Sequence, residues 1–278
     1  ADAAAKEALR AVVIATATAS YREPFGADFP VALMPYGAQT ISEHMIESLA
    51  NAGVTHIDLV VSDRPEAIRS ILGNGRRWGV SLNWHLAKDP ARPYDGLRAL
   101  DLMGCRRVLI GHVDRVIAGV SALNMVNQDK VALYIDGFDQ LSWAGWASMS
   151  GAKVMAAVEA GALDPRQNDW RMFEGERMML SRELCMRVHD ARSLLDAQKS
   201  VLEMMDVPPT WIKRPWGAQS PKSHVDAAAQ IEGPVLIGPG CFVGPRSSIG
   251  PHVVLTRNVV VSSDTQIENS LVMPDTLI

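Results

Sequence analysis

Residues 11–45, AVVIATATASYREPFGADFPVALMPYGAQTISEHM, are the stretch around which the chain is organised. Ala11–Ile14 is a short run of apolar side chains, which is typical of a parallel strand buried on both faces. A helix is expected to begin at Ile41. A strand that leads through small residues into a helix is where α/β proteins hold phosphate groups, because backbone N–H groups converge there. Positions 16–19 of this loop, however, contain no glycine.

Downstream of this unit, apolar runs alternate with amphipathic stretches. The expected strands are 54–61, 80–86 and 107–110, and the expected helices are 41–52, 64–72 and 97–103. Ser62 and Asp63 are expected to cap the second of these helices. This alternation predicts an α/β fold built on a doubly wound, mostly parallel sheet of the Rossmann type. Such sheets bind ligands at the carboxyl ends of their strands.

Residues 115–180 have a weaker pattern, in which we expect a strand at 131–135 and a helix at 152–159. A further helix is expected at 194–205. A group of tryptophans, which includes Trp143 and Trp146, has no clean period. Such a group could line a sugar site, but packing of the second half of the domain is the favoured interpretation.

From residue 231 onward, aliphatic side chains recur at every sixth position. The series is Ile231, Ile237, Val243, Ile249, Leu255, Val261, Ile267 and Met273. Hexapeptide repeats of this kind predict a left-handed parallel β-helix, with each aliphatic side chain inside a triangular prism. The last repeat has no capping element, so we expect further chain or another subunit to cover that end. The predicted organisation is an α/β domain over 1–210, a linker over 211–224 and the β-helix over 225–278.

Composition restricts the function classes. The 278 residues are 47% apolar and 21% charged, with a net charge of -4, so no nucleic-acid footprint is indicated. No apolar run approaches the roughly 18 residues that a membrane span needs. The three cysteines, Cys105, Cys185 and Cys241, have no metal-ligand spacing and are expected to be reduced thiols in the cytoplasm.

Residues 11–110 together with the repeats resemble the sugar-1-phosphate nucleotidyltransferases, which make NDP-sugars. The family opening, roughly AVILAGGxGTRLxPLTxxxPKxLLPVxGxPLIEH, aligns without a gap. Six positions of this chain fall on their family counterparts: Pro24, Pro30, Leu33, Pro35, Glu43 and His44. The later segments LANAGVTHIDLVVS and ILGNGRRWGVSL also match. The resemblance implies the family fold and an ancestry in nucleotidyl transfer.

The catalytic positions of the family motif are changed. Thr16 and Ala17 stand where the family has paired glycines, Tyr21 stands in place of the arginine, and Val31 in place of the lysine. A Cβ obstructs close approach of the backbone to a triphosphate, and the lost cations would have offset its charge. Each lost contact of this kind typically costs about 3 kcal/mol of transition-state stabilisation. We therefore expect no catalytic residue here.

The same loop is expected to be a vestigial nucleotide-binding segment. Its residues are Ala15, Thr16, Ala17, Thr18 and Arg22. The alternative is an unusual loop that still binds a nucleotide, with Arg22 standing in for the missing arginine. The segment 94–96 also departs from the family's sugar and base loop.

The metal-binding positions that the resemblance implies are changed as well. Val113 stands where the family has the aspartate that holds Mg²⁺, and Arg187 stands where it has the second carboxylate. Asp114 follows one residue late and would face the other way on an extended backbone. It is either a displaced metal ligand or, as we favour, a solvated loop residue. A slip in the weaker second alignment would bring His189 into play. No cofactor is expected, although Mg²⁺ would be needed by an active enzyme.

The sequence thus predicts a pseudoenzyme with a regulatory or scaffolding role in nucleotide-sugar or polysaccharide biosynthesis. The expected partners are further copies of the chain, an active nucleotidyltransferase or a polysaccharide-synthesis protein, with a nucleotide or NDP-sugar as ligand. One alternative is an active nucleotidyltransferase. A second is a hexapeptide-repeat acyltransferase that uses His224 or His252. His112 and His189 could be acid–base groups, but structural roles are favoured because no carboxylate partner is evident.

Overall fold

The structure is a computed structural model of the chain, and it describes residues 9–16, 29–117, 130–136, 140–161, 176–179, 185–205, 207 and 209–278. The chain divides into two compact units. The first unit combines Ala1–Leu33 with Ile41–Asp190, and the second combines Met34–Thr40 with Ala191–Ile278. The short segment 34–40 therefore belongs to the second unit, although both of its sequence neighbours belong to the first.

The centre of the first unit is β1 (Arg10–Ala15), the strand predicted at 11–14. It pairs in parallel with β4 (His56–Val61) on one side and with β6 (Val108–His112) on the other. Beyond β4, the parallel strand β5 (Ser81–Leu86) forms the edge of the sheet. A strand with neighbours on both edges and helices on both faces is apolar throughout, which explains the run AVVIA.

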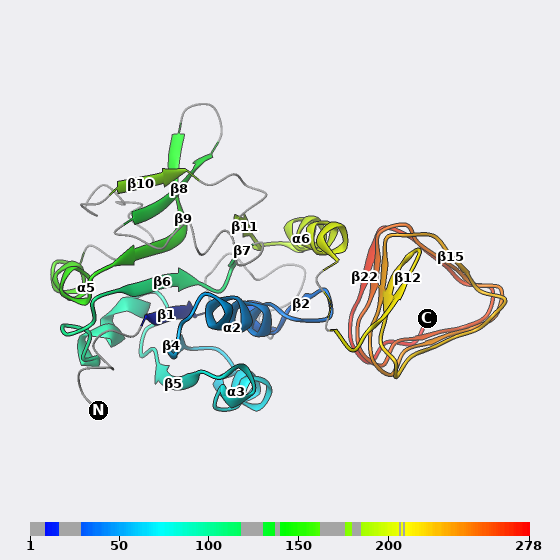
Figure 1. The fold of residues 1–278 in the computed structure, drawn as a ribbon, viewed down its shortest axis with the longest axis horizontal. Coiled ribbons are helices and arrows are strands. Elements are labelled where there is room, and N and C mark those ends of the chain that lie inside the picture. Colours follow the sequence, from blue (N-terminus) through cyan, green and yellow to red (C-terminus); the bar gives the residue numbers. More distant parts are fainter. Residues whose placement is uncertain are drawn as a thin grey trace. The chain divides into compact units, whose positions relative to one another are not determined.

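The sheet continues beyond β6 with three more strands. They are β9 (Gln140–Met149), β8 (Lys130–Asp136) and β10 (Glu176–Met179), so that the order is β10-β8-β9-β6-β1-β4-β5. Only β9 runs antiparallel to its neighbours, and four of the six neighbouring pairs are parallel. The predicted mostly parallel α/β sheet is confirmed (Figure 1).

Helical segments cover both faces of this sheet (Figure 1). α2 (Ile41–Asn51) and α3 (Pro65–Leu72) lie on one face, and the predicted apolar stripe of α2 is buried. η4 (Pro93–Ala99) and α5 (Gly151–Glu159) pack on the other face, in one apolar cluster with β1 and β4. The remaining 3-10 turns of this unit are η2 (Val31–Leu33) and η3 (Arg76–Trp78).

Two local predictions were wrong. The helix expected at 97–103 is replaced by η4, after which Leu100 is extended. Leu97, Leu100 and Leu102 are all buried in the same cluster, and positions i and i+5 do not lie on one face of an α-helix. α3 begins after Arg64, which has a φ of 41° and makes no side-chain cap, so that the expected cap at residues 62–63 is not formed.

A buried ion pair joins three neighbouring strands of the sheet, β1, β4 and β5. Asp58 on β4 is fully buried and accepts a 2.6 Å hydrogen bond from Arg10 Nε and a 2.9 Å bond from His85 Nε2. Arg10 also donates to the backbone oxygen of Asp101. Burial on its own raises the pKa of the Asp58 carboxyl, but the bonds from Arg10 and His85 outweigh it and hold the pKa below its usual value.

The second unit begins with a hairpin held by a helix. β2 (Pro35–Tyr36) and β3 (Gln39–Thr40) form the hairpin, and the helix is α6 (Ala191–Met204). The buried Gln198 amide accepts a 2.8 Å bond from Gly37 N and donates a 2.7 Å bond to Pro35 O. Among the helices in the described ranges, none has the length and apolar composition that crossing a membrane requires.

Residues 217–278 form a prism of short parallel strands in three sheets (Figure 1). The strands are β13 (Gly217–Gln219), β16 (Val235–Ile237), β19 (Val253–Leu255) and β22 (Ser270–Val272) in the first sheet, β14 (His224–Val225), β17 (Phe242–Val243) and β20 (Val260–Val261) in the second, and β15 (Gln230–Ile231), β18 (Ser248–Ile249) and β21 (Gln266–Ile267) in the third. The aliphatic series from Ile237 to Ile267 is buried along the axis. This arrangement is compatible with the predicted β-helix.

The six-residue period slips once, between the corners at Asp264 and Asn269. Left-handed corner residues recur every sixth position at Arg246, His252, Asn258 and Asp264, but the next is Asn269, only five residues on. Val272 therefore pairs with Leu255 and fills the interior, at 7% exposure. The prediction that Met273 takes this place was wrong, because one corner residue is missing after Ile267.

The segment expected to be a linker is instead part of the second unit. β12 (Ile212–Arg214) and β13 form a hairpin, and β13 pairs in parallel with β16. The prism therefore begins before the predicted residue 225. α6, which we expected in the first domain, also belongs to the second unit.

The register slip predicts a stability difference between two adjacent residues. Val272→Ala should lower the free energy of unfolding by roughly 2 kcal/mol, because it removes buried methyl groups and leaves a cavity. Met273→Ala, at a partly exposed position, should change it by less than about 0.5 kcal/mol. Urea unfolding of the full chain, followed by circular dichroism, measures both values. A larger loss of unfolding free energy for Met273→Ala than for Val272→Ala would show that Met273 fills the interior, as the unbroken six-residue period predicts.

Candidate functional site

The candidate site lies where β1 and β6 end, at the carboxyl edge of the parallel strands. β6 ends at His112, and Val113 N donates a 2.9 Å bond to Ile14 O on β1. The chain then turns and forms β7 (Arg115–Ile117), which pairs antiparallel with β11 (Cys185–Arg187). This pairing brings Arg187 to Asp114, although 73 residues separate them in sequence.

Asp114 is surrounded by two guanidinium groups. Its Oδ2 atom lies 3.6 Å from Arg115 Nε and 3.8 Å from Arg187 Nε. Val188 N also donates a 2.8 Å bond to the backbone oxygen of Asp114. The Asp114 side chain is only 12% exposed, whereas that of Arg187 is 44% exposed. We call Asp114, Arg115 and Arg187 the Asp114 cluster; its formal charge is positive, from two cations and one anion.

Two glycines and a tryptophan set the position of Arg115. Gly145 has a φ of 81°, and a Cβ there would collide with the Arg115 side chain. Trp146 donates a 2.9 Å bond from its indole nitrogen to Arg115 O, and its ring occupies the space that a Cβ on Gly111 would need. The guanidinium of Arg115 is thus placed by packing as well as by charge.

His112 and Cys185 are buried beside the cluster and are neutral at pH 7. Tyr94 forms a hydrogen bond with His112 Nε2 through its hydroxyl. Burial lowers the pKa of His112 to about 4; Arg115 and Arg187 act in the same direction and Asp114 opposes them. Burial raises the pKa of Cys185 to about 12, and its thiol donates to Ala144 O. Neither group is placed for acid–base chemistry near neutral pH.

The predicted site residues fall into two groups. Ala15 ends β1 and Thr16 follows it; Val31 is buried in η2, and Val113 is buried next to Asp114. Four predicted positions lie outside the described residues: Ala17, Thr18, Tyr21 and Arg22.

The expectation that Asp114 is a solvated loop residue was wrong. The argument from an extended backbone fails because the chain turns directly after His112. Asp114 is 8% exposed, and its charge reaches His112, for which the sequence suggested no carboxylate partner. The sequence did not indicate the roles of Tyr94, Arg115 and Trp146, since each depends on pairing between distant segments. The packing interpretation of the tryptophans agrees with the burial of Trp146.

The other candidate histidines have no role in the cluster's charge balance. His189 is partly exposed and lies beside the cluster, with its Nδ1 atom 3.4 Å from Arg187 O and its Nε2 atom 3.6 Å from the Asp190 carboxylate. His224 stacks on Phe242, and His252 occupies a left-handed corner with a φ of 57°.

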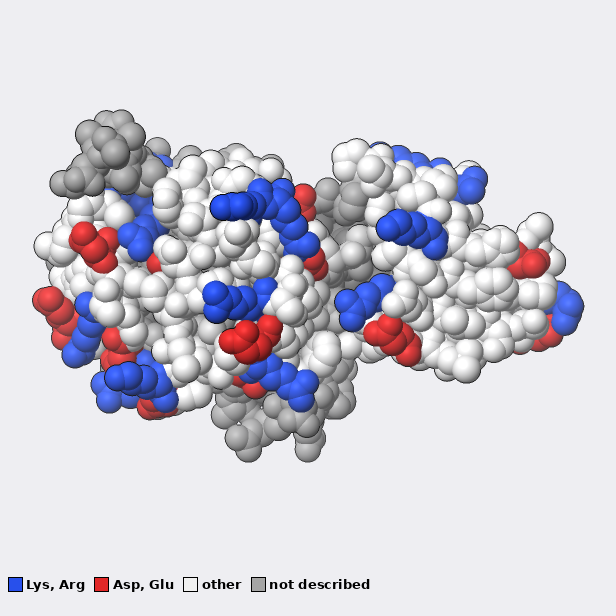
Figure 2. All heavy atoms as spheres, turned by 90° about the horizontal axis from the view of Figure 1, so that it is seen from below, with Lys and Arg blue, Asp and Glu red and all other residues white. Residues whose placement is uncertain are grey.

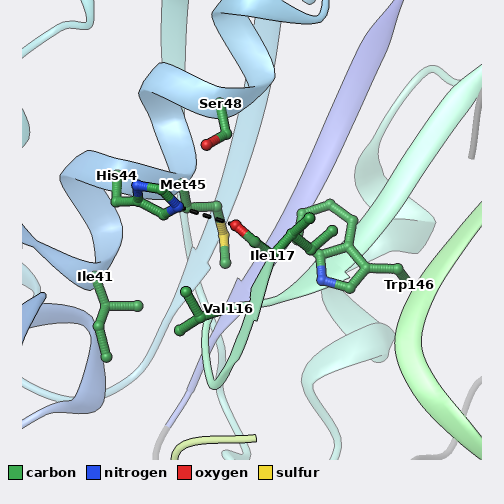
Figure 3. Close-up of a pocket in the computed structure, with 7 residues that line it drawn as sticks. All are labelled: Ile41, His44, Met45, Ser48, Val116, Ile117 and Trp146. Carbon is green, nitrogen blue, oxygen red and sulfur yellow. Dashed lines mark hydrogen bonds between the residues drawn. The ribbon is translucent and has the colours of Figure 1, made fainter. Parts of the chain in front are cut away.

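A small pocket lies between α2 and β7 (Figure 3). It is lined by Ile41, His44, Met45, Ser48, Val116, Ile117 and Trp146. His44 Nε2 donates a 3.0 Å bond to the backbone oxygen of Ile117, so that this histidine is satisfied inside the protein. The pocket has room for about one water molecule, and a nucleotide or sugar does not fit.

The residues present do not fit a divalent cation. Mg²⁺ requires several hard, anionic oxygen ligands, whereas the cluster offers one carboxylate between two cations. Within the described ranges, no three His, Cys, Asp or Glu side chains are grouped so as to hold a metal ion. On the face shown in Figure 2, basic and acidic side chains are interspersed, without one broad basic area.

Comparisons with known proteins place this arrangement in context. No family model matches the sequence. The chain is 26% identical over 110 residues to the low-salt glycan biosynthesis nucleotidyltransferase Agl11 of Haloferax volcanii. That match spans 39% of this chain and 29% of the relative, so the chain covers less than a third of that protein's length.

A solved structure extends the likeness to most of the chain. The protein, assigned as a glucose-1-phosphate thymidylyltransferase of Bacillus anthracis, was solved in complex with a sucrose. Its fold matches with a TM-score of 0.54 at 15% identity, over 72% of this chain and 97% of that chain. At this identity the likeness establishes the fold alone. Together the two relatives support a fold like that of the sugar nucleotidyltransferases.

His112 should make stability depend on pH in a defined direction. Its pKa is about 4 in the folded chain and about 6.5 when unfolded. The unfolded chain therefore binds more protons below about pH 6.5, so the His112 contribution is complete above that pH and falls toward pH 4. Between about pH 7.5 and pH 5 the loss should be roughly 2 kcal/mol.

Urea unfolding at several pH values tests this expectation. His112→Gln, which cannot titrate, should flatten the profile between about pH 7.5 and pH 5, whatever its effect on stability at pH 7.5. Equal slopes for the wild type and His112→Gln would contradict the assignment.

Proposed function

We propose that this protein is a nucleotidyltransferase-like pseudoenzyme with a regulatory or scaffolding role in nucleotide-sugar or polysaccharide biosynthesis. The likeness to a glycan biosynthesis nucleotidyltransferase and to a sugar-1-phosphate thymidylyltransferase supports this area of metabolism. Its partner would be an active nucleotidyltransferase, a polysaccharide-synthesis protein or another copy of the chain. We place the protein in the cytoplasm, where such nucleotide-activated sugars are made.

The Asp114 cluster is the observation that carries the proposal. Asp114 is the carboxylate nearest to the end of β6, and its charge is already balanced by Arg115 and Arg187. A metal ion that entered would have to displace Arg187 and face the repulsion of Arg115. The cluster is therefore stable without a cofactor, and we propose that none is bound.

The loop after β1 supports the same conclusion. Thr16 follows directly on the buried Ala15, where the matching family motif has glycine. Val31, at the position of the family lysine, is 8% exposed and offers no positive charge. Losing one transition-state contact costs about 3 kcal/mol, so the combined changes should leave little phosphoryl transfer.

We further propose that residues 217–278 are a left-handed β-helix of hexapeptide repeats that serves assembly. The parallel strand pairs of the prism before β22 have an 18-residue register, from Val235 to Val253 for example, which corresponds to three hexapeptides per turn; the β19–β22 pair, after the slip, has 17. His224 and His252 lie at exposed or corner positions without a neighbouring catalytic group in the described residues, so acyl transfer is not favoured.

Turnover is the direct test of the pseudoenzyme proposal. A coupled pyrophosphate-release assay should be run with Mg²⁺ across several pairs of nucleoside triphosphate and sugar 1-phosphate. We expect no release above background, with an active nucleotidyltransferase as the positive control. Turnover within tenfold of a typical ~10 s⁻¹ would contradict the proposal and make the protein an active, Mg²⁺-dependent enzyme.

Ligand binding should not need a metal ion. If an NDP-sugar or nucleoside triphosphate raises the melting temperature, the shift should be the same in EDTA and in Mg²⁺, because Arg187 supplies the positive charge. Arg187→Ala should then reduce the shift, while Arg106→Ala, at an exposed arginine of the same unit, should leave it unchanged. A shift that appears only with Mg²⁺ would contradict this expectation.

A further inference from the structure

The three faces of the prism differ in their outward side chains. In the sheet of β13, β16, β19 and β22, the outward residues Leu236 and Val254 are apolar, yet each is only 1% exposed. They are covered by the same unit, since Gly37 of the hairpin lies against Leu236 and α6 contacts β22. In the sheet of β15, β18 and β21, the outward residues are the polar Gln230, Ser248 and Gln266, which need no cover.

The third face is apolar and uncovered. Its outward residues are His224, Phe242, Val260 and Leu277, which we call the apolar ladder. They are neighbours in register across β14, β17, β20 and the last residues of the chain. Phe242 is 41% exposed, Val260 38% and Leu277 74%, and the His224 and Phe242 rings stack with centroids 5.3 Å apart. A continuous apolar row on one face marks an interaction surface more often than isolated exposed residues do.

We propose that the apolar ladder is the contact surface between two copies of this chain, related by a two-fold axis parallel to the ladder. In such a dimer the same patch serves both partners, so Phe242, Val260 and Leu277 would each face their own counterparts. The covered sheet of the prism provides an internal precedent, since its apolar outward residues are buried under another element.

Two charged residues beside the ladder favour a second copy of the chain as the partner and determine how that copy is oriented. Lys222 and Asp226 flank opposite ends of β14. Asp226 Oδ1 accepts a 2.8 Å bond from Ala228 N and its charge reaches Arg246, whose ion pair is with Asp264, so that neither Lys222 nor Asp226 has an ion pair of its own within the described part of the chain. The two-fold axis parallel to the ladder sets Lys222 of one copy opposite Asp226 of the other, twice per dimer. The perpendicular two-fold axis would set Lys222 opposite Asp275, which is already bound by Asn258 and paired with Arg257.

Sedimentation equilibrium of the full chain at micromolar concentration tests the surface. The wild type should be a dimer. Phe242→Glu and Leu277→Glu should each raise the dissociation constant at least about a hundredfold, because they place like charges opposite each other in a desolvated contact. Ile212→Glu, at an exposed apolar residue on the edge strand β12, and Leu86→Glu, on β5 of the other unit, are matched controls and should remain dimeric.

Charge reversal tests the orientation. Lys222→Asp and Asp226→Lys should each weaken the dimer about tenfold, since each sets like charges against one another. The double variant should return to the wild-type dissociation constant, with circular dichroism confirming that every variant is folded.

A chain that stays monomeric to about 100 μM would overturn the proposal and leave the face to a different protein. A dimer that survives Phe242→Glu would also overturn it. Failure of the double variant to recover would reject the parallel two-fold axis.

Discussion

A buried carboxylate has to be balanced by positive charge, and this constraint sets the character of the first unit. Asp58, buried on β4, is balanced by Arg10 through a direct 2.6 Å bond. Asp114, at the carboxyl end of β6, is balanced by Arg115 and Arg187. Both charges are satisfied by the chain itself. At this end of the sheet the carboxylate of Asp114 is therefore engaged by cations of the chain itself.

The fold and the handling of phosphate depend on different residues. The fold can therefore be kept when the phosphate-handling residues change. The strand run at 11–15, the stripe of α2 and the buried strands β4 and β6 are fixed by apolar packing, which tolerates any phosphate chemistry or none. Phosphate handling needs glycines and cations at a few positions after β1, and these contribute little to the core. Val31, at the position of the family lysine, is buried in η2 and contributes to the core. Under the proposed function, residues of this kind would preserve the scaffold without supporting phosphate chemistry.

The sequence was sufficient where a single period or a buried run decides the structure. It predicted β1, α2, β4, α3 and β5 and the short parallel strands of the prism, because each depends on local patterning. It failed at residues 97–103, where three leucines are buried by a turn and an extended segment, and at Met273, where one missing corner residue shifts the register. At the site it found Asp114 and Arg187 but missed their contact, since pairing of β7 with β11 cannot be read from local pattern.

In the prism, the repeat restricts the residue types at inward positions and leaves the outward positions variable. From β16 to β22 an aliphatic residue of each strand fills the interior, and this inward residue therefore carries no information about partners. The outward residue is not restricted in this way, so whether it is polar or apolar depends on what packs against it. Polar residues such as Gln230 face water, and Leu236 faces the hairpin and α6 of its own unit. By the same reasoning, the outward Phe242 and Val260 remain 41% and 38% exposed among the described residues, and this is why we assign their face to a second copy of the chain.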